Sequence, residues 1–85
     1  KDNSRMVKTH EINLNTTEFN RFANSNYIVL EVNNIEVNDY ILFKQIELVD
    51  GSTTETGLFK MTKVKELIQN DGFKEGYALL IVNNI

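Results

Sequence analysis

The order of apolar and polar residues along this 85-residue chain predicts several strands and one short helix. Between residues 40 and 49, Ile41, Phe43 and Gln45 alternate with their neighbours, as expected for a strand with one buried face. On the same grounds, strands are predicted over residues 6–12, 27–32, 40–49 and 77–82.

The segment after residue 49 predicts a hairpin. Asp50-Gly51-Ser52 is a strong turn signal, and residues 53–56 begin the returning strand. Residues 58–70 are ambiguous by periodicity. Phe59 and Met61 fit a strand, whereas the spacing of Val64, Leu67 and Ile68 fits a short amphipathic helix.

A helix is predicted to begin at Asn15 or Thr16 and to end near Asn24. Its start has a capping residue and an acid, Glu18, in the first turn. Phe19 and Phe22 share one face of this helix. Leu14, just before the cap, is expected to pack back onto this face.

The strand at residues 27–32 is apolar at almost every position, which predicts burial on both of its faces. Glu31 interrupts this run and allows two interpretations. It either faces water at a sheet edge or lies in the wall of a cleft beside a basic partner such as Arg21 or a lysine.

One helix and about five strands predict a single α+β domain over residues 1–85, built as a small barrel or rolled sheet. The chain has no proline, so its corners depend on Asn, Asp and Gly. Three clusters of asparagine are expected to mark these corners: Asn24-Ser25-Asn26, Asn33-Asn34 and Asn83-Asn84.

Composition narrows the range of functions. The chain has no cysteine and no apolar run long enough to cross a membrane, which favours a reducing, cytoplasmic setting without a membrane partner. The formal net charge of −3 argues against a strong nucleic-acid binder. Lys60, Lys63 and Lys65 nevertheless lie close together in sequence and form either a solvated face or a patch for an anionic ligand.

Few residues are available for catalysis. His10 is the single histidine, and its neighbour Glu11 points to the opposite face of a strand, so the two do not act on one group. His10 is expected to be a hydrogen-bonded structural residue, with a general base as the alternative. No metal-ligand set, phosphate-binding glycine motif or serine-nucleophile context is present, so neither a metal nor a cofactor is expected.

Three segments resemble the ASCH domains of the PUA-like superfamily, in particular the short bacterial and phage DUF3850-type group. Lys8–Ile12 precedes the helix, and Glu31-Val32 with Val37–Leu42 is similar to the pattern "E-[IV] … V-G-D-x-[IL]". Thr56-Gly57, Lys63-Val64 and then Asp71–Leu80 resemble the ending "T-G-R … K-V … G-[LF]-x-x-G-Y-V-x-L". The resemblance extends over residues 7–82.

This resemblance implies a PUA-like mixed barrel with the helix packed across its opening, and strand rather than helix for residues 58–69. It also implies an RNA- or nucleotide-binding domain. Of the cleft signature "G-x-K-x-x-E-x-R", the chain keeps Glu31 alone, with Asn26, Ile28 and Asn33 at the other positions. The cleft motif is thus degenerate.

Three functions follow from this comparison. The first is binding of RNA or a nucleotide. The second is a protein-interaction or regulatory domain that has lost the ancestral site, and the third, less favoured, is a nucleoside amidohydrolase. A non-catalytic role is preferred to an enzyme. The candidate RNA contacts are Arg21, Tyr27, Glu31, Lys60, Lys63 and Lys65.

Overall fold

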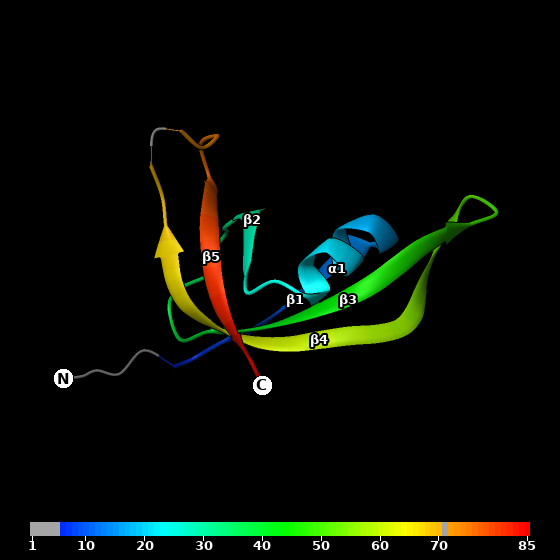
Figure 1. Ribbon diagram of the computed structural model, residues 1–85, viewed down its shortest axis with the longest axis horizontal. Helices are drawn as coiled ribbons and strands as arrows, with labels where there is room; N and C mark the ends of the chain where they lie inside the picture. Colours follow the sequence, from blue (N-terminus) through cyan, green and yellow to red (C-terminus); the bar gives the residue numbers. More distant parts are fainter. Residues whose placement is uncertain (1–5, 71) are drawn as a thin grey trace.

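The computed structural model describes residues 6–70 and 72–85, which form one helix and five strands (Figure 1). In chain order the elements are β1 (Thr9–Asn15), α1 (Thr16–Ala23), β2 (Tyr27–Glu31), β3 (Tyr40–Val49), β4 (Ser52–Ile68) and β5 (Tyr77–Asn84). The α+β class predicted from the sequence is therefore confirmed.

All five strands belong to one mixed sheet with the order β1-β3-β4-β5-β2. β1 pairs with β3 in parallel, and the other three pairings are antiparallel. The outer strands β1 and β2 share no pairing among the described residues, so closure into a barrel is not shown. α1 lies over one face of the sheet, close to β3 (Figure 1).

β4 connects two parts of the sheet. Its first part forms a long hairpin arm with β3, and its last part, from Thr62 to Ile68, pairs with β5. The pairing shifts at two bulges, one facing Lys44 to Ile46 and one between Val64 and Glu66. Bulges increase bending and twist, which accounts for the strong curve of β4 in Figure 1.

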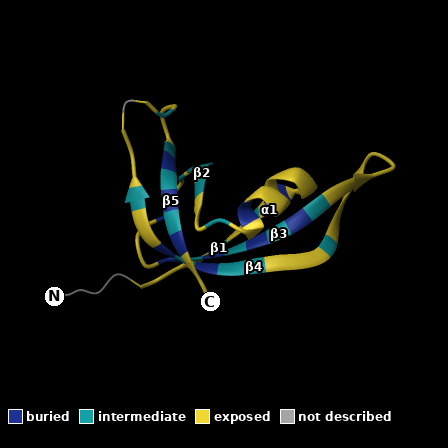
Figure 2. Cartoon of the chain, viewed as in Figure 1, coloured by how far each residue is buried: buried dark blue, intermediate teal, exposed yellow. Residues whose placement is uncertain are grey.

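The core lies between α1 and the concave face of the sheet, where buried residues gather in Figure 2. Phe22 and Phe43 form its aromatic centre, with ring centroids 4.5 Å apart. The rest of the buried cluster consists of Leu14, Phe19, Ile35, Ile41, Val64, Leu80 and Val82. Gln45 is buried on the same side as Ile41 and Phe43, as the alternation predicted.

Local sequence accounts for the helix. The Asn15 side chain accepts a hydrogen bond from the Glu18 N–H, while the Glu18 carboxylate accepts one from the Asn15 N–H. This reciprocal capping box fixes the start of α1, and the helix ends at Asn24. The predicted bounds of the helix are confirmed.

The clusters Asn24-Ser25-Asn26 and Asn33-Asn34 lie at corners before and after β2, as predicted, but Asn83-Asn84 lies within β5 and marks no corner. Asn34, Asn38 and Asp50 have positive φ angles of 67°, 79° and 50°. Asn and Asp tolerate this left-handed backbone better than other side chains. Asp50 and Gly51, both with positive φ, form the tight turn between β3 and β4.

Two predictions need correction. The strand expected over residues 27–32 is not buried on both faces, because β2 is an outer strand and Tyr27, Val29 and Glu31 are exposed. The first strand extends from Thr9 to Asn15 rather than over residues 6–12, because its pairing with β3 begins at Thr9 and continues to Asn15. The ambiguous segment after residue 58 is strand, since β3 and β5 pair with β4 on its two sides.

Within the described part of the chain, no helix is long and apolar enough to span a bilayer.

Candidate binding groove

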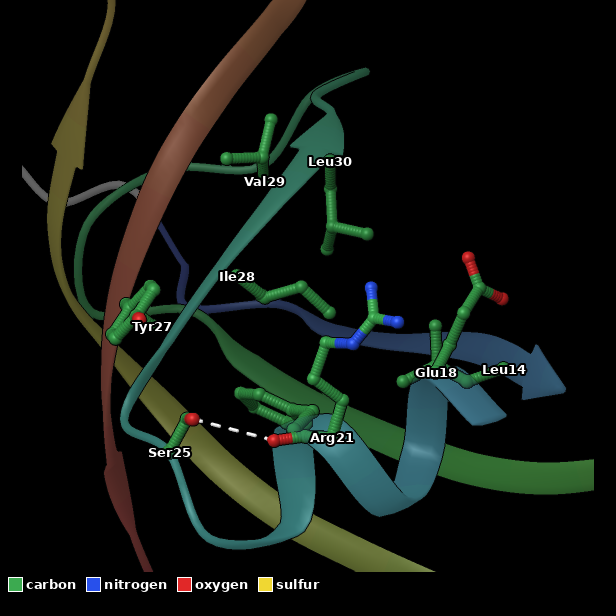
Figure 3. A pocket seen from close by; sticks show the side chains of 9 residues that line it. Leu14, Glu18, Arg21, Ser25, Tyr27, Ile28, Val29 and Leu30 are labelled. Carbon is green, nitrogen blue, oxygen red and sulfur yellow. Dashed lines mark hydrogen bonds between the residues drawn. The ribbon is translucent and has the colours of Figure 1, made fainter. Parts of the chain in front are cut away.

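A groove of about 300 Å³ lies between α1 and β2 (Figure 3). Leu14, at the end of β1, and Phe22, on the inner face of α1, contribute its apolar part. The full lining consists of Leu14, Glu18, Arg21, Phe22, Ser25, Tyr27, Ile28, Val29 and Leu30. The groove therefore runs along almost the whole length of β2.

The hydrogen-bond pattern of β2 determines which backbone groups face away from β5. The Val82 N–H donates to the Asn26 carbonyl, and the Val32 N–H donates to the Gly76 carbonyl. Backbone groups alternate in direction along an antiparallel strand, so Ile28 and Leu30 also bond toward β5. The N–H and C=O groups of Tyr27, Val29 and Glu31 therefore point to the opposite, unpaired side.

These groups have no hydrogen-bond partner among the described residues. β2 is thus a free strand edge beside a groove. Side chains alternate as well. Ile28 and Leu30 point toward α1, whereas Tyr27 and Val29 point to the other side of the strand (Figure 3).

Arg21 and Glu18 are the charged residues of the groove. The Glu18 carboxylate is engaged in the capping box at the start of α1, 3.3 Å from the Asn15 nitrogen. The Arg21 side chain extends toward Ile28 and Leu30 (Figure 3) and forms no ion pair with a described residue. The lining of the groove includes one cation and one anion, so the groove is not a basic surface.

The other predicted contacts are distributed over the molecule. Tyr27 borders the groove, but its ring points away from Arg21 (Figure 3). Glu31 is exposed at the end of β2, as in the interpretation that places it in water. It forms no ion pair with a described residue.

Lys60 lies under the end of α1 rather than on an open surface. Its ammonium donates hydrogen bonds to the carbonyls of Phe22, Ala23 and Ser25, at 3.1, 3.3 and 2.8 Å. It also lies 4.1 Å from the centroid of the Phe22 ring. Burial lowers the pKa of Lys60 below its ordinary value. Through its hydrogen bonds to these carbonyls, Lys60 caps the carboxyl end of the helix.

Lys63 and Lys65 do not join Lys60. Lys63 faces Tyr40 across the β3–β4 pair, with its ammonium 5.7 Å from the Tyr40 ring centroid. Lys65 is exposed at the second bulge of β4. The three lysines are close in sequence, but the structure does not bring them together in one site.

His10 is part of a separate polar cluster. Its Nε2 atom is 2.9 Å from Oδ2 of Asp39, which is fully buried. The Asp39 carboxylate also accepts hydrogen bonds from the backbone N–H groups of Lys8 and Glu36, each at 3.1 Å. Glu11 is on the outer face, where it contacts Lys44 at 2.9 Å. His10 and Asp39 hold the start of β1 against the loop before β3.

Asp39 is the residue that sequence reasoning missed. Its signal was present in Asn38-Asp39, where a corner precedes a regular strand, but the parallel pairing of β1 with β3 was needed to place His10 beside it. Among the described residues, no three His, Asp or Glu side chains gather where they would hold a metal ion.

Comparison with known proteins adds no relative: neither the models of protein families nor the curated proteins include a match to this chain. The similarity to ASCH domains remains a prediction from the sequence motifs.

Proposed function

We propose that this chain is a protein-interaction domain that binds an extended segment of a partner along the free edge of β2. The main observation in support is the set of unpaired backbone groups of Tyr27, Val29 and Glu31 beside an apolar groove. A strand placed there would receive main-chain hydrogen bonds from β2 and side-chain contacts from the groove.

The sequence of β2 supports this choice of edge. Natural edge strands are commonly protected by lysine, proline, bulges or a polar sequence. β2 has none of these: it reads Tyr-Ile-Val-Leu-Glu and pairs with β5 in uniform register. The free edge in the first part of β4 differs, because it includes a bulge and the polar stretch Thr53–Thr56.

The proposal requires an open sheet, because a closed barrel of the predicted ASCH type would leave no free strand edge. Both outer strands contribute to the groove, β1 through Leu14 and β2 along its length. An added strand next to β2 would occupy this side of the sheet.

Binding of RNA is the alternative from the sequence. It would require several cations and a stacking ring on one surface. Arg21 and Tyr27 both border the groove, but Lys60 is engaged under the helix, and Lys63 and Lys65 lie elsewhere. For this reason we favour a peptide segment over RNA as the ligand.

The proposal is tested by selecting a displayed library of random peptides on the protein and mapping the enriched peptides by NMR. We expect enriched sequences with apolar residues at alternate positions. We also expect slower hydrogen exchange for the amides of Tyr27, Val29 and Glu31. The Ile28 and Leu30 amides, which already bond toward β5, serve as internal controls.

Two proline variants at neighbouring positions of β2 distinguish its free edge from the edge that is paired with β5. Val29→Pro removes an N–H that points to the free edge, so it should abolish peptide binding while the domain stays folded. Ile28→Pro removes an N–H within the β5 ladder, so it should destabilise the domain. If Val29→Pro unfolds the protein, a peptide that is N-methylated at its bonding positions gives the same test with the native chain.

Two results would contradict the proposal. One is the absence of any enriched peptide that protects the β2 amides. The other is salt-sensitive binding of single-stranded RNA that shifts the resonances of Arg21 and Tyr27, which would favour the RNA-binding function.

A further inference from the structure

We infer that the segment bound at β2 has one acidic side chain facing Arg21, with an apolar side chain two residues away on each side. This inference rests on the proposed function and specifies its ligand. It assigns Arg21 as the residue that selects among extended peptides.

The two charged side chains of the groove differ in their partners. Glu18 already accepts a hydrogen bond from the Asn15 N–H, which holds its carboxylate at the start of α1. Arg21 is one turn further along the helix and forms no ion pair among the described residues. An incoming carboxylate is therefore the complementary partner for Arg21, and a guanidinium binds a carboxylate through paired hydrogen bonds.

The Arg21 side chain extends from α1 toward Ile28 and Leu30, the two β2 side chains that point toward the helix (Figure 3). Side chains of an added strand would alternate in the same way. Those on the helix side of the strand would meet Arg21, and those on the other side would lie with Tyr27 and Val29.

The groove around Arg21 is lined mainly by apolar side chains. Leu14 and Phe22 are 4% and 3% exposed, and Ile28 and Leu30 are half-buried. Apolar side chains of the ligand would cover this surface on both sides of the acidic residue. The expected pattern is thus apolar, any, acidic, any, apolar.

The inference is tested with three blocked peptides that differ at one position. The first is Thr-Val-Thr-Glu-Thr-Val-Thr, and the others have Gln or Lys in place of Glu. Binding is measured by titration of the Tyr27, Val29 and Glu31 amide resonances. We expect the Glu peptide to bind about fivefold more tightly than the Gln peptide, and its advantage to fall as salt is added.

A charge exchange identifies the partner residue. Arg21→Glu should remove the preference for the Glu peptide and produce a preference for the Lys peptide. Lys65→Glu is the matched control, because it makes the same change in net charge at another exposed cation. It should leave the order of the three peptides unchanged.

The possible results separate the inference from the proposed function. If the Glu and Gln peptides bind equally at the β2 amides, the inference is wrong and strand addition stands. If no peptide changes those amides, the proposed function fails. If the same amides become protected as protein concentration rises, without peptide, the occupant is a second copy of this chain, and the inference is again wrong.

Discussion

The Nε2 atom of His10 lies 2.9 Å from Oδ2 of Asp39, and this contact joins two strands that are separated by the helix and β2 in the chain. His10 is on the inner face of β1, and Asp39 directly precedes β3. The same carboxylate accepts the N–H groups of Lys8 and Glu36. Asp39 is therefore a buried acceptor for several donors, a role that only a carboxylate performs fully.

Replacement of Asp39 tests this role. Asp39→Asn puts an amide NH₂ group where an oxygen accepts hydrogen bonds, so a buried donor loses its acceptor. We expect the free energy of unfolding to fall by about 2–3 kcal/mol, measured by urea denaturation. Glu47→Gln, an exposed change of the same chemical kind in β3, is the control and should have almost no effect. Equal stability of the two variants would contradict the role assigned to Asp39.

Lys60 provides a second test, because it was predicted to contact RNA phosphates and is found under α1. Lys60→Met removes the hydrogen bonds to the carbonyls of Phe22, Ala23 and Ser25 together with the cation over the Phe22 ring. We expect a loss of about 1–2 kcal/mol in the free energy of unfolding. Lys65→Met is the control at an exposed site. If the two variants lose the same stability, Lys60 does not cap the helix.

The pKa values of Lys44 and Lys60 should deviate in opposite directions from the ordinary lysine pKa of 10.5. The hydrogen bond from Lys44 to Glu11, with the charges of Glu11 and Glu55, raises the pKa of Lys44. Desolvation by burial lowers the pKa of Lys60. NMR titration of the lysine side chains should therefore show Lys60 losing its proton first and Lys44 later.

These shifts also determine how stability changes with pH. The stabilising effect of the Lys44 charge is fully present below pH 10.5 and is lost as pH rises through its higher folded-state pKa. The lowered pKa of Lys60 has the opposite sign, so its contribution to stability rises with pH between its folded-state pKa and 10.5. Loss of the Lys44 proton before that of Lys60 would contradict this assignment.

The elements with local signals were predicted well. The capping residue Asn15 with Glu18 fixed the start of α1, and Asp50-Gly51 fixed the hairpin turn, because each depends on residues close in sequence. The alternation of Ile41, Phe43 and Gln45 likewise identified the buried face of β3. The α+β class follows from these elements.

The candidate site was harder to predict, because it depends on pairing between distant strands. The apolar run of β2 is equally compatible with a central and an outer strand, so the free edge was not visible in the sequence. The lysines show the same limit. Residues three apart in a strand lie on opposite faces of the sheet. Lys60 therefore lies on the face of its cross-strand partner Phe43, and Lys63 lies on the other face with its partner Tyr40.

Substitutions at Gly57 test why the first bulge of β4 contains a glycine. The pairing moves from Lys44–Phe59 to Ile46–Glu55, so β4 advances four residues while β3 advances two. Gly57 lies within this segment with a φ of +93°, and an added Cβ would meet no atom within 4 Å. The backbone conformation, rather than space, therefore requires glycine here.

Gly57→Ala should lower the free energy of unfolding by about 1–2 kcal/mol, because an alanine is strained at positive φ. Gly57→Asn should lose less, since asparagine tolerates this region better. The neighbouring hydrogen bond from the Thr56 hydroxyl to Oε1 of Gln45, at 2.8 Å, gives a second measurement. Chemical shifts of the Gln45 side-chain amide should change more in the alanine variant than in the asparagine variant. A greater loss for the asparagine variant than for the alanine variant would indicate that side-chain volume, not backbone strain, determines the choice of glycine.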